Sequence, residues 1–210
     1  MNRTAIKICG LTRPQDMLAA LDAGADAVGL VFYRLSSRYV TIEQAVALAR
    51  LVPPSVCLVG LFVNAMAVDV KAVLNVVPLD LLQFHGDDAY ETEAYCKQFG
   101  KPYLKAARMA PDLDLIEYAS RYPSAQALLL DAFVEGYGGG GKTFDWSLIP
   151  KSLPLPIVLS GGLNPDNVTE AIRIVRPAGV DVSSGVEQSK GIKDAAKITA
   201  FIAGVKKADV

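Results

Sequence analysis

The most constraining feature of this chain is a regular alternation of short apolar segments with stretches of helical periodicity. Apolar, β-branched runs occur eight times and predict strands at residues 5–9, 27–32, 56–62, 79–84, 103–107, 127–131, 157–160 and 179–183. Helical spacing follows at 14–23, 41–51, 64–76, 89–99, 112–121, 165–175 and 192–205, with only a short turn at 145–149 after the sixth strand. Thr41 is expected to cap the second helix, and Asn164 with Pro165 to open the helix at 165–175.

Continuous apolar strands need cover on both faces, so the alternation predicts a parallel sheet wrapped by helices. Eight βα units of about 25 residues each use the whole chain, and we expect one (β/α)8 TIM-barrel domain over residues 1–210. The alternative is an open, doubly wound sheet, which the sequence excludes only weakly.

Composition narrows the class of protein. Hydrophobic residues make up 51% of the 210 residues, and 21 Lys+Arg against 22 Asp+Glu leave no excess charge for nucleic acid or an anionic membrane. No stretch reaches the roughly 18 uninterrupted apolar residues of a membrane span, and the N-terminus has no signal-peptide pattern. We expect a cytoplasmic protein that binds neither nucleic acid nor membrane. A monomer is expected, with a homodimer as the alternative.

Cysteine and histidine usage bears on metal sites. The three cysteines, Cys9, Cys57 and Cys96, are odd in number and widely spaced, which fits neither a disulfide framework nor a zinc motif. His85 is the only histidine, so a site with several histidine ligands is excluded. The sequence predicts reduced thiols and no metal.

Cys9 and Asp131 each end a predicted strand. Side chains at the carboxyl ends of barrel strands converge on one pocket, so both are candidate catalytic groups. Lys7 faces the same side as Cys9, and its ammonium is expected to raise the thiolate fraction. The alternatives are a buried structural cysteine, and an Asp131 that caps a helix or forms a loop salt bridge.

Further polar groups lie where strands two and four end. Arg38 follows the second strand and has a guanidinium suited to a planar carboxylate, although a solvated loop arginine is the commoner case. Gln83 and His85 close the fourth strand and add polar groups to the rim. His85 is equally suited to bracing a loop.

Small residues follow the last two strands. Gly161 and Gly162 come after the seventh strand, and Ser183, Ser184 and Gly185 after the eighth. Barrels commonly bind phosphate in these two loops through backbone N–H groups, so a phosphate site is predicted there. Ordinary tight turns explain the glycines about as well.

Residues 136–143 match the P-loop pattern G-x-x-x-x-G-K-[ST]. A working P-loop joins its strand directly to a helix, whereas several residues here separate the loop from Asp131 and the segment that follows is too short for that helix. We interpret the match as a glycine-rich lid over the barrel rather than a nucleotide site.

Seven motifs in order resemble the phosphoribosylanthranilate isomerase family over nearly the whole chain. They are Lys7-Ile8-Cys9-Gly10, Ser37-Arg38-Tyr39-Val40, Gln83-Phe84-His85-Gly86, Leu130-Asp131, Gly141-Lys142-Thr143-Phe144-Asp145-Trp146, Ser160-Gly161-Gly162-Leu163 and Asp181-Val182-Ser183-Ser184-Gly185-Val186-Glu187. The resemblance implies a tryptophan-pathway isomerase with Cys9 as general base and Asp131 as general acid. It implies contact of Arg38 with the anthranilate carboxylate and binding of phosphate by the two small-residue loops. It also assigns Lys7, Gln83, His85 and Asp181 to substrate binding. Ser37 stands where many relatives have proline.

The implied reaction is an Amadori rearrangement of N-(5-phosphoribosyl)anthranilate, a small phosphorylated substrate, to 1-(2-carboxyphenylamino)-1-deoxyribulose 5-phosphate. Asp131 would protonate the ring oxygen, and Cys9 as thiolate would take the C2′ proton from the resulting iminium. No cofactor is expected, because the iminium is the electron sink. The scheme needs the pKa of Asp131 raised by burial and that of Cys9 lowered by Lys7 or the bound imine.

Two rival functions remain at this point. One is a related phosphate-binding barrel enzyme; two carboxylates in place of Cys9 and Asp131 would mark the histidine-pathway isomerase. The other is a non-catalytic nucleotide-binding module that uses residues 136–143.

Overall fold

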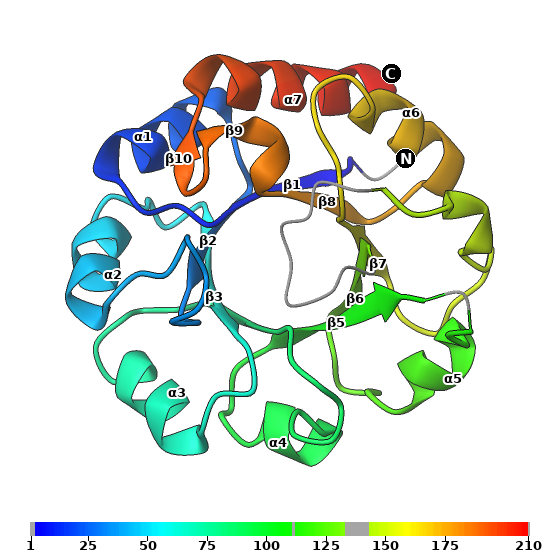
Figure 1. The fold of residues 1–210 in the computed structure, drawn as a ribbon, viewed down its shortest axis with the longest axis horizontal. Helices are drawn as coiled ribbons and strands as arrows, with labels where there is room; N and C mark the ends of the chain where they lie inside the picture. Colours follow the sequence, from blue (N-terminus) through cyan, green and yellow to red (C-terminus); the bar gives the residue numbers. More distant parts are fainter. Residues whose placement is uncertain (1–2, 111, 133–142, 210) are drawn as a thin grey trace.

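The computed structural model describes residues 3–110, 112–132 and 143–209, in which eight parallel strands close into a barrel (Figure 1). The strands are β1 Ala5–Cys9, β2 Ala27–Val31, β3 Cys57–Phe62, β4 Leu81–Phe84, β5 Tyr103–Met109, β6 Ala127–Ala132, β7 Ile157–Leu159 and β8 Gly179–Val182. Each strand pairs with the next, and β8 pairs with β1, so this sheet has no edge. The predicted barrel is confirmed, and the open doubly wound sheet is wrong.

Helices surround the barrel (Figure 1). They are α1 Pro14–Ala23, α2 Ile42–Ala49, α3 Ala67–Leu74, α4 Glu93–Lys97, α5 Leu115–Ser120, α6 Val168–Val175 and α7 Ala195–Ala208. The single turns η1 Trp146–Leu148 and η2 Ser184–Val186 are 3₁₀ helices, and η1 confirms the short turn expected after the sixth strand. No helix in the described ranges is long and apolar enough to cross a membrane.

Local signals explain several helix ends. The Thr41 hydroxyl accepts from the Gln44 N–H while the Gln44 side chain accepts from the Thr41 N–H, a reciprocal cap that contributes about 1 kcal/mol. Gly24 ends α1 in the left-handed region at φ 95°, where a side chain would be strained.

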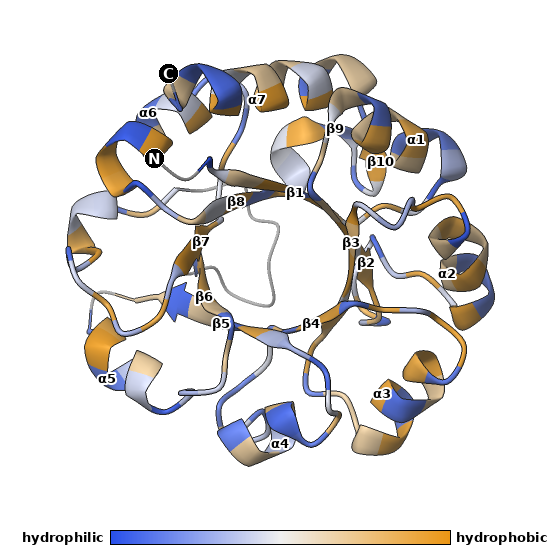
Figure 2. Ribbon diagram, turned by 180° about the vertical axis from the view of Figure 1, so that it is seen from behind, coloured by the Kyte–Doolittle hydropathy of each residue, from blue (hydrophilic) through white to orange (hydrophobic). Residues whose placement is uncertain are grey.

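Two apolar clusters make up the core. The larger joins the outer faces of the strands to the helices. The smaller contains only strand residues, at alternate positions of β5 and β6, and packs against Leu81 of β4 and Val158 of β7. No helix residue belongs to this cluster, whereas the outer faces of the strands pack against helices, so the smaller cluster lies in the barrel interior. Viewed from behind, the barrel strands are mainly hydrophobic, whereas the surrounding helices carry much of the polar surface (Figure 2).

The sequence prediction was wrong around the last helix. Residues 192–205 were expected to be helical, but Ile192–Lys193 form β10, which pairs antiparallel with β9 Glu187–Ser189. The helix begins only after Asp194, whose carboxylate accepts from the N–H groups of Ala196 and Lys197.

Helix α6 also begins later than expected, at Val168 instead of Pro165. The Asn164 side chain accepts from the N–H groups of Asp166 and Asn167, so it closes a turn that precedes the helix. Helices α3, α4 and α5 are shorter than expected, because flanking residues such as Asn64 and Thr92 form loop contacts or caps.

Candidate active site

Polar side chains occupy inward-facing positions near the carboxyl ends of the strands, the end called the mouth below. Lys7 and Cys9 lie two residues apart on β1, so they face the same side of the sheet. His85, just after β4, contacts Asp131 on β6, although β5 lies between these strands. A contact that skips a strand crosses the interior, so the mouth holds these groups.

Cys9 lies in a buried group with Lys7 and Asp181. Lys7 Nζ is 2.8 Å from Asp181 Oδ1, and both side chains are nearly inaccessible to solvent. Gly29 of β2 faces Cys9 across the ladder, and a Cβ there would lie 2.8 Å from Cys9 Sγ. The glycine therefore makes room for the thiol.

Burial dominates the ionisation of this group. Desolvation raises the pKa of Cys9, and the Lys7 charge lowers it only in part, so the net shift is upward. Lys7 therefore acts on the thiol pKa in the expected direction, but the expected net lowering is wrong for the free protein. Desolvation also acts against the Lys7 ammonium, but Asp181 and Cys9 outweigh it and the pKa of Lys7 is raised.

Asp131 has two polar partners. Its Oδ1 accepts from the Ala132 N–H at 2.9 Å, and its Oδ2 lies 3.1 Å from His85 Nε2. Gln83 Nε2 lies 3.3 Å from His85 Nδ1, so the three side chains form a buried chain. Gln83 Oε1 is buried and has no hydrogen-bond partner within the described part of the protein.

Arg38 is not a solvated loop arginine. Its Nε and Nη2 donate to Glu187 Oε1 and Oε2 at 2.7 and 2.8 Å. Its stem crosses Gly10, where an added Cβ would lie 2.5 Å from Arg38 Cδ. The guanidinium is therefore fixed beside the turn that follows Cys9.

The two small-residue loops lie against each other and against Asp131. A Cβ on Gly185 would overlap the Leu163 carbonyl at 1.8 Å, and one on Gly161 would lie 2.9 Å from Asp131 Oδ1. Gly161 and Gly162 have φ of 78° and 68°, which few side chains tolerate. Close packing explains the glycine at position 185, and a positive φ explains Gly161 and Gly162. Because these loops have small side chains, their backbone N–H groups can approach a ligand closely.

The Ser183 hydroxyl is already engaged. It donates to the Cys9 carbonyl at 3.1 Å and accepts from Lys193 Nζ at 3.2 Å. Ser184 lies in η2 immediately after it. Any phosphate contact from Ser183 would thus come from its backbone.

Reasoning from sequence missed three buried charges around the mouth. Glu187 and Lys193 pair at 3.0 Å on β9 and β10. Glu91 accepts from the N–H groups of Asn64 and Gly86 and so braces the loop that carries His85. Glu187 belongs to a motif already identified, but Lys193 was assigned to a helix. Glu91 gave no signal in the sequence.

The described residues contain no cluster of three or more His, Cys, Asp or Glu side chains able to hold a metal ion. Residues 133–142, which include most of the glycine-rich segment, lie outside the described part, so the lid interpretation stays a prediction.

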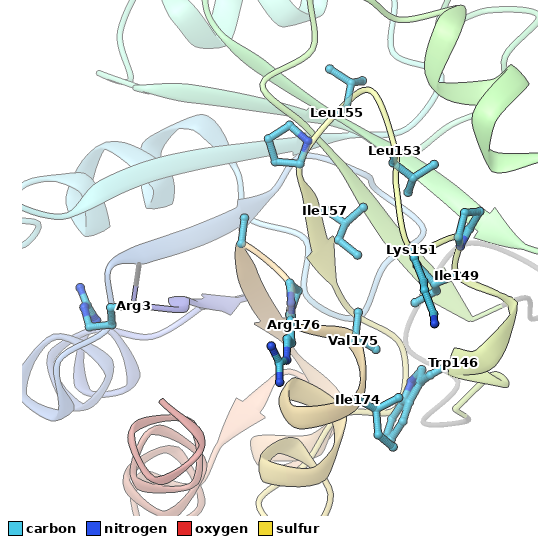
Figure 3. Close-up of a pocket in the computed structure, with 14 residues that line it drawn as sticks. Arg3, Trp146, Ile149, Lys151, Leu153, Leu155, Ile157, Ile174, Val175 and Arg176 are labelled. Carbon is cyan, nitrogen blue, oxygen red and sulfur yellow. The ribbon is translucent and has the colours of Figure 1, made fainter. Parts of the chain in front are cut away.

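A pocket of about 710 Å³ lies at the opposite end of the barrel (Figure 3). Arg3, Ile157 and Ala178 in its lining precede or begin β1, β7 and β8, which places it at the amino ends of these strands. Arg3 lies on one side, and Trp146 and Lys151 lie on the other. None of its lining residues is Asp, Glu, His or Cys, so it holds neither a carboxyl group nor a thiol.

Comparison with known proteins identifies the family. Residues 6–204 match the family model described as N-(5'phosphoribosyl)anthranilate (PRA) isomerase. The N-(5'-phosphoribosyl)anthranilate isomerase of Dechloromonas aromatica (strain RCB) is 59% identical over 207 residues, which cover 99% of this chain and 98% of the relative.

Two solved structures extend the likeness to the fold. Phosphoribosyl anthranilate isomerase from Thermotoga maritima is 42% identical with a TM-score of 0.89, and the match covers 97% of this chain and 99% of that one. A phosphoribosyl anthranilate isomerase in complex with reduced 1-(o-carboxyphenylamino)-1-deoxyribulose 5-phosphate is 39% identical with a TM-score of 0.85, over the same shares of the two chains. The chain therefore belongs to the N-(5'-phosphoribosyl)anthranilate isomerase family.

Proposed function

We propose that Cys9 is the general base and Asp131 the general acid of this enzyme. The chain is an isomerase that converts N-(5'-phosphoribosyl)anthranilate to 1-(2-carboxyphenylamino)-1-deoxyribulose 5-phosphate in tryptophan biosynthesis. The proposed roles rest on one observation. Cys9 is the last residue of β1 and Asp131 the last but one of β6, so the thiol and the carboxyl lie at the same mouth. The reaction needs one proton given and one taken, and we assign these steps to the Asp131 carboxyl and the Cys9 thiol.

Asp131 would protonate the ring oxygen of the substrate and open the ring to an iminium. In the observed arrangement the Gln83 amide donates to His85 Nδ1, so Nε2 bears the ring proton and donates to Asp131. That arrangement suits the carboxylate after its proton has left. If the Gln83 amide turns over, His85 Nε2 becomes an acceptor and suits the protonated acid. In this proposal Gln83 and His85 hold the Asp131 carboxyl in place and can hydrogen-bond to it with or without its proton.

Cys9 would then remove the C2′ proton. Burial keeps the thiol largely protonated in the free enzyme. The iminium formed by ring opening is a new positive charge close to Cys9, and it favours the thiolate when the base is needed. Lys7 and Asp181 hold the thiol in place, and the enolamine produced tautomerises to the ketone without metal or organic cofactor.

Binding would use both ends of the substrate. Arg38 would take the anthranilate carboxylate, and backbone N–H groups of the loops at Gly161, Gly162, Ser184 and Gly185 would take the phosphate. We place the enzyme in the cytoplasm and keep a monomer as the expected state. A nucleotide module using residues 136–143 would instead bind ATP with magnesium, and we expect no such binding.

The test compares Cys9→Ala and Asp131→Asn with wild type, using substrate generated in situ from anthranilate and phosphoribosyl pyrophosphate by a coupling transferase. Each positioned acid or base typically contributes 10²- to 10⁴-fold, so kcat should fall at least about a hundredfold in each variant. Loss of anthranilate-type fluorescence reports the isomerisation.

Cys57→Ala is the matched control, because Cys57 is also a thiol on a barrel strand but begins β3 at the opposite end. It should retain wild-type kcat. Full activity in Cys9→Ala or Asp131→Asn would refute the role given to that residue.

A further inference from the structure

The guanidinium of Arg38 is held by a neighbour that has no assigned role. Glu187 accepts from Nε and Nη2 of Arg38. The side chain of Glu187 is only 5% exposed and that of Arg38 only 12%. A guanidinium has two edges that can each meet a carboxylate with parallel hydrogen bonds. Glu187 occupies the edge formed by Nε and Nη2, which leaves the edge formed by Nη1 and Nη2 for a second carboxylate.

Glu187 is itself held from behind by Lys193. Lys193 Nζ donates to Glu187 Oε1 at 3.0 Å and to the Ser183 carbonyl at 2.9 Å, and its side chain is fully buried. Desolvation would raise the pKa of Glu187, but Arg38 and Lys193 outweigh it and lower the pKa. The carboxylate is therefore ionised and is shared by the two cationic side chains.

The hairpin formed by β9 and β10 contacts the loop after β1, the first turn of α1 and the loop that carries Arg38. Thr12 donates to the Gly191 carbonyl at 2.8 Å, and the Lys193 N–H donates to Asp16 at 3.1 Å. Gly191 lies so close to the loop that carries Arg38 that an added Cβ would be 2.7 Å from the Ser37 carbonyl oxygen. The hairpin thus fixes Glu187 relative to the segment that carries Arg38.

We propose that Glu187 and Lys193 are positioning residues that present the free edge of Arg38 to the substrate carboxylate. The proposal rests on the role given to Arg38 under the proposed function. Glu187 fixes the guanidinium, and Lys193 keeps Glu187 in place and links it to Ser183, next to the loop that would hold the phosphate. The pair therefore sets the distance between the two ends of the binding site.

The test measures kcat, KM and the dissociation constants of two ligands for Glu187→Gln. One ligand is reduced 1-(o-carboxyphenylamino)-1-deoxyribulose 5-phosphate, and the other is its phenylamino analogue, which lacks the carboxylate. Loss of a fixed side-chain orientation weakens binding by about tenfold, so KM and the first dissociation constant should rise by that factor. The analogue should bind within about twofold of wild type, and kcat should stay nearly constant because the lost binding is uniform.

A second variant guards against instability. Glu187→Gln leaves Lys193 buried without its carboxylate, whereas Glu187→Gln with Lys193→Met removes both charges. The double variant should fold, as judged by urea unfolding. It should bind the ligand that has a carboxylate more weakly and the analogue without it as tightly as wild type. In an Arg38→Met background, Glu187→Gln should cause no further loss of affinity for the carboxylate ligand.

The possible failures are distinguishable. If Arg38→Met leaves binding of the carboxylate ligand unchanged, the proposed role of Arg38 is wrong and the positioning role with it. If Arg38→Met weakens that ligand but Glu187→Gln leaves it unchanged or tightens it, Glu187 merely competes for Arg38 and the positioning role alone is overturned. Equal weakening of both ligands in the Glu187 variants would show general damage and would also overturn it.

Discussion

Lys7 and Lys105 are both buried strand lysines, yet they face opposite sides of the same sheet. Lys7 points into the barrel, where its Nζ lies 2.8 Å from Asp181 beside the Cys9 thiol. Lys105 points outward, where its Nζ donates to the Gly86 carbonyl at 2.8 Å and to Glu91 at 3.1 Å.

The difference lies in what surrounds each charge. Around Lys105 the partners are loop groups and the ring of Tyr122, 5.6 Å from Nζ. Glu91 also accepts hydrogen bonds from the backbone N–H groups of Asn64 and Gly86, so this cluster braces loops. Around Lys7 there is a thiol that can change its proton state. A buried charge is therefore not by itself a sign of catalysis. Whether it faces the barrel interior or the helices determines whether it can act on the catalytic groups.

The largest expected effect is on stability, and it should be similar for both lysines. Removing one partner of a buried ion pair typically costs about 3–5 kcal/mol, so Lys7→Met and Lys105→Met should each lower the free energy of unfolding by that amount. Urea unfolding measures the loss. Activity per folded molecule should separate the two, because only Lys7→Met should lower kcat/KM. If Lys105→Met lowers it equally, the comparison between the two faces fails.

The next effect is on rate and its dependence on pH. Burial raises the pKa of Cys9. In Asp131→Asn, where the general acid no longer titrates, the residual kcat/KM should therefore rise with pH through a thiol ionisation above the ordinary value of about 8.5. Lys7 lowers that pKa, so Lys7→Met should displace the rise to higher pH and reduce kcat/KM at neutral pH by about a hundredfold.

Lys105→Met is the control for the pH profile and should leave it unchanged. The profile of kcat, which reports the enzyme with substrate bound, should rise at lower pH than that of kcat/KM because the iminium favours the thiolate. A kcat/KM that is flat from pH 6 to 9 in Asp131→Asn would contradict an ionising Cys9.

The contrast between the faces also explains what the sequence predicted and what it did not. Strand periodicity located all eight barrel strands, because buried parallel strands are continuous apolar runs. It also placed Cys9 and Asp131 at strand ends. The same continuity hid which face Lys105 occupies, since neighbours on both sides of it are apolar. Only the closed barrel distinguishes inside from outside.

Contacts between distant segments were equally invisible. Arg38 and Glu187 are 149 residues apart, so nothing local identifies them as partners. The hairpin at Glu187–Lys193 consists of strands of three and two residues, too short for an alternating pattern to emerge. Its place is set by Asp16 of α1 and by Ser37 of the loop after β2. The pKa of Cys9 was expected to fall because proximity to Lys7 can be read from spacing, whereas the extent of burial cannot.

The smallest expected effect comes from two glycines that distinguish the faces without any change of charge. A Cβ on Gly29, inside the barrel, would lie 2.8 Å from Cys9 Sγ, and one on Gly60, outside it, would lie 2.4 Å from Leu79 Cδ1. Overpacking of this kind typically costs about 1–3 kcal/mol, so Gly29→Ala and Gly60→Ala should lose similar stability.

Their effects on catalysis should differ. Gly29→Ala must displace the thiol by a few tenths of an ångström, and misplacement on that scale should lower kcat on the order of tenfold. Gly60→Ala displaces only a leucine on the helix side and should keep kcat within about twofold, because it touches no group at the mouth. Steady-state kinetics on both variants, corrected for the folded fraction, checks the pair. If kcat falls equally in both, rate follows general loosening of the sheet; if only Gly29→Ala falls, the position of Cys9 Sγ itself limits the reaction.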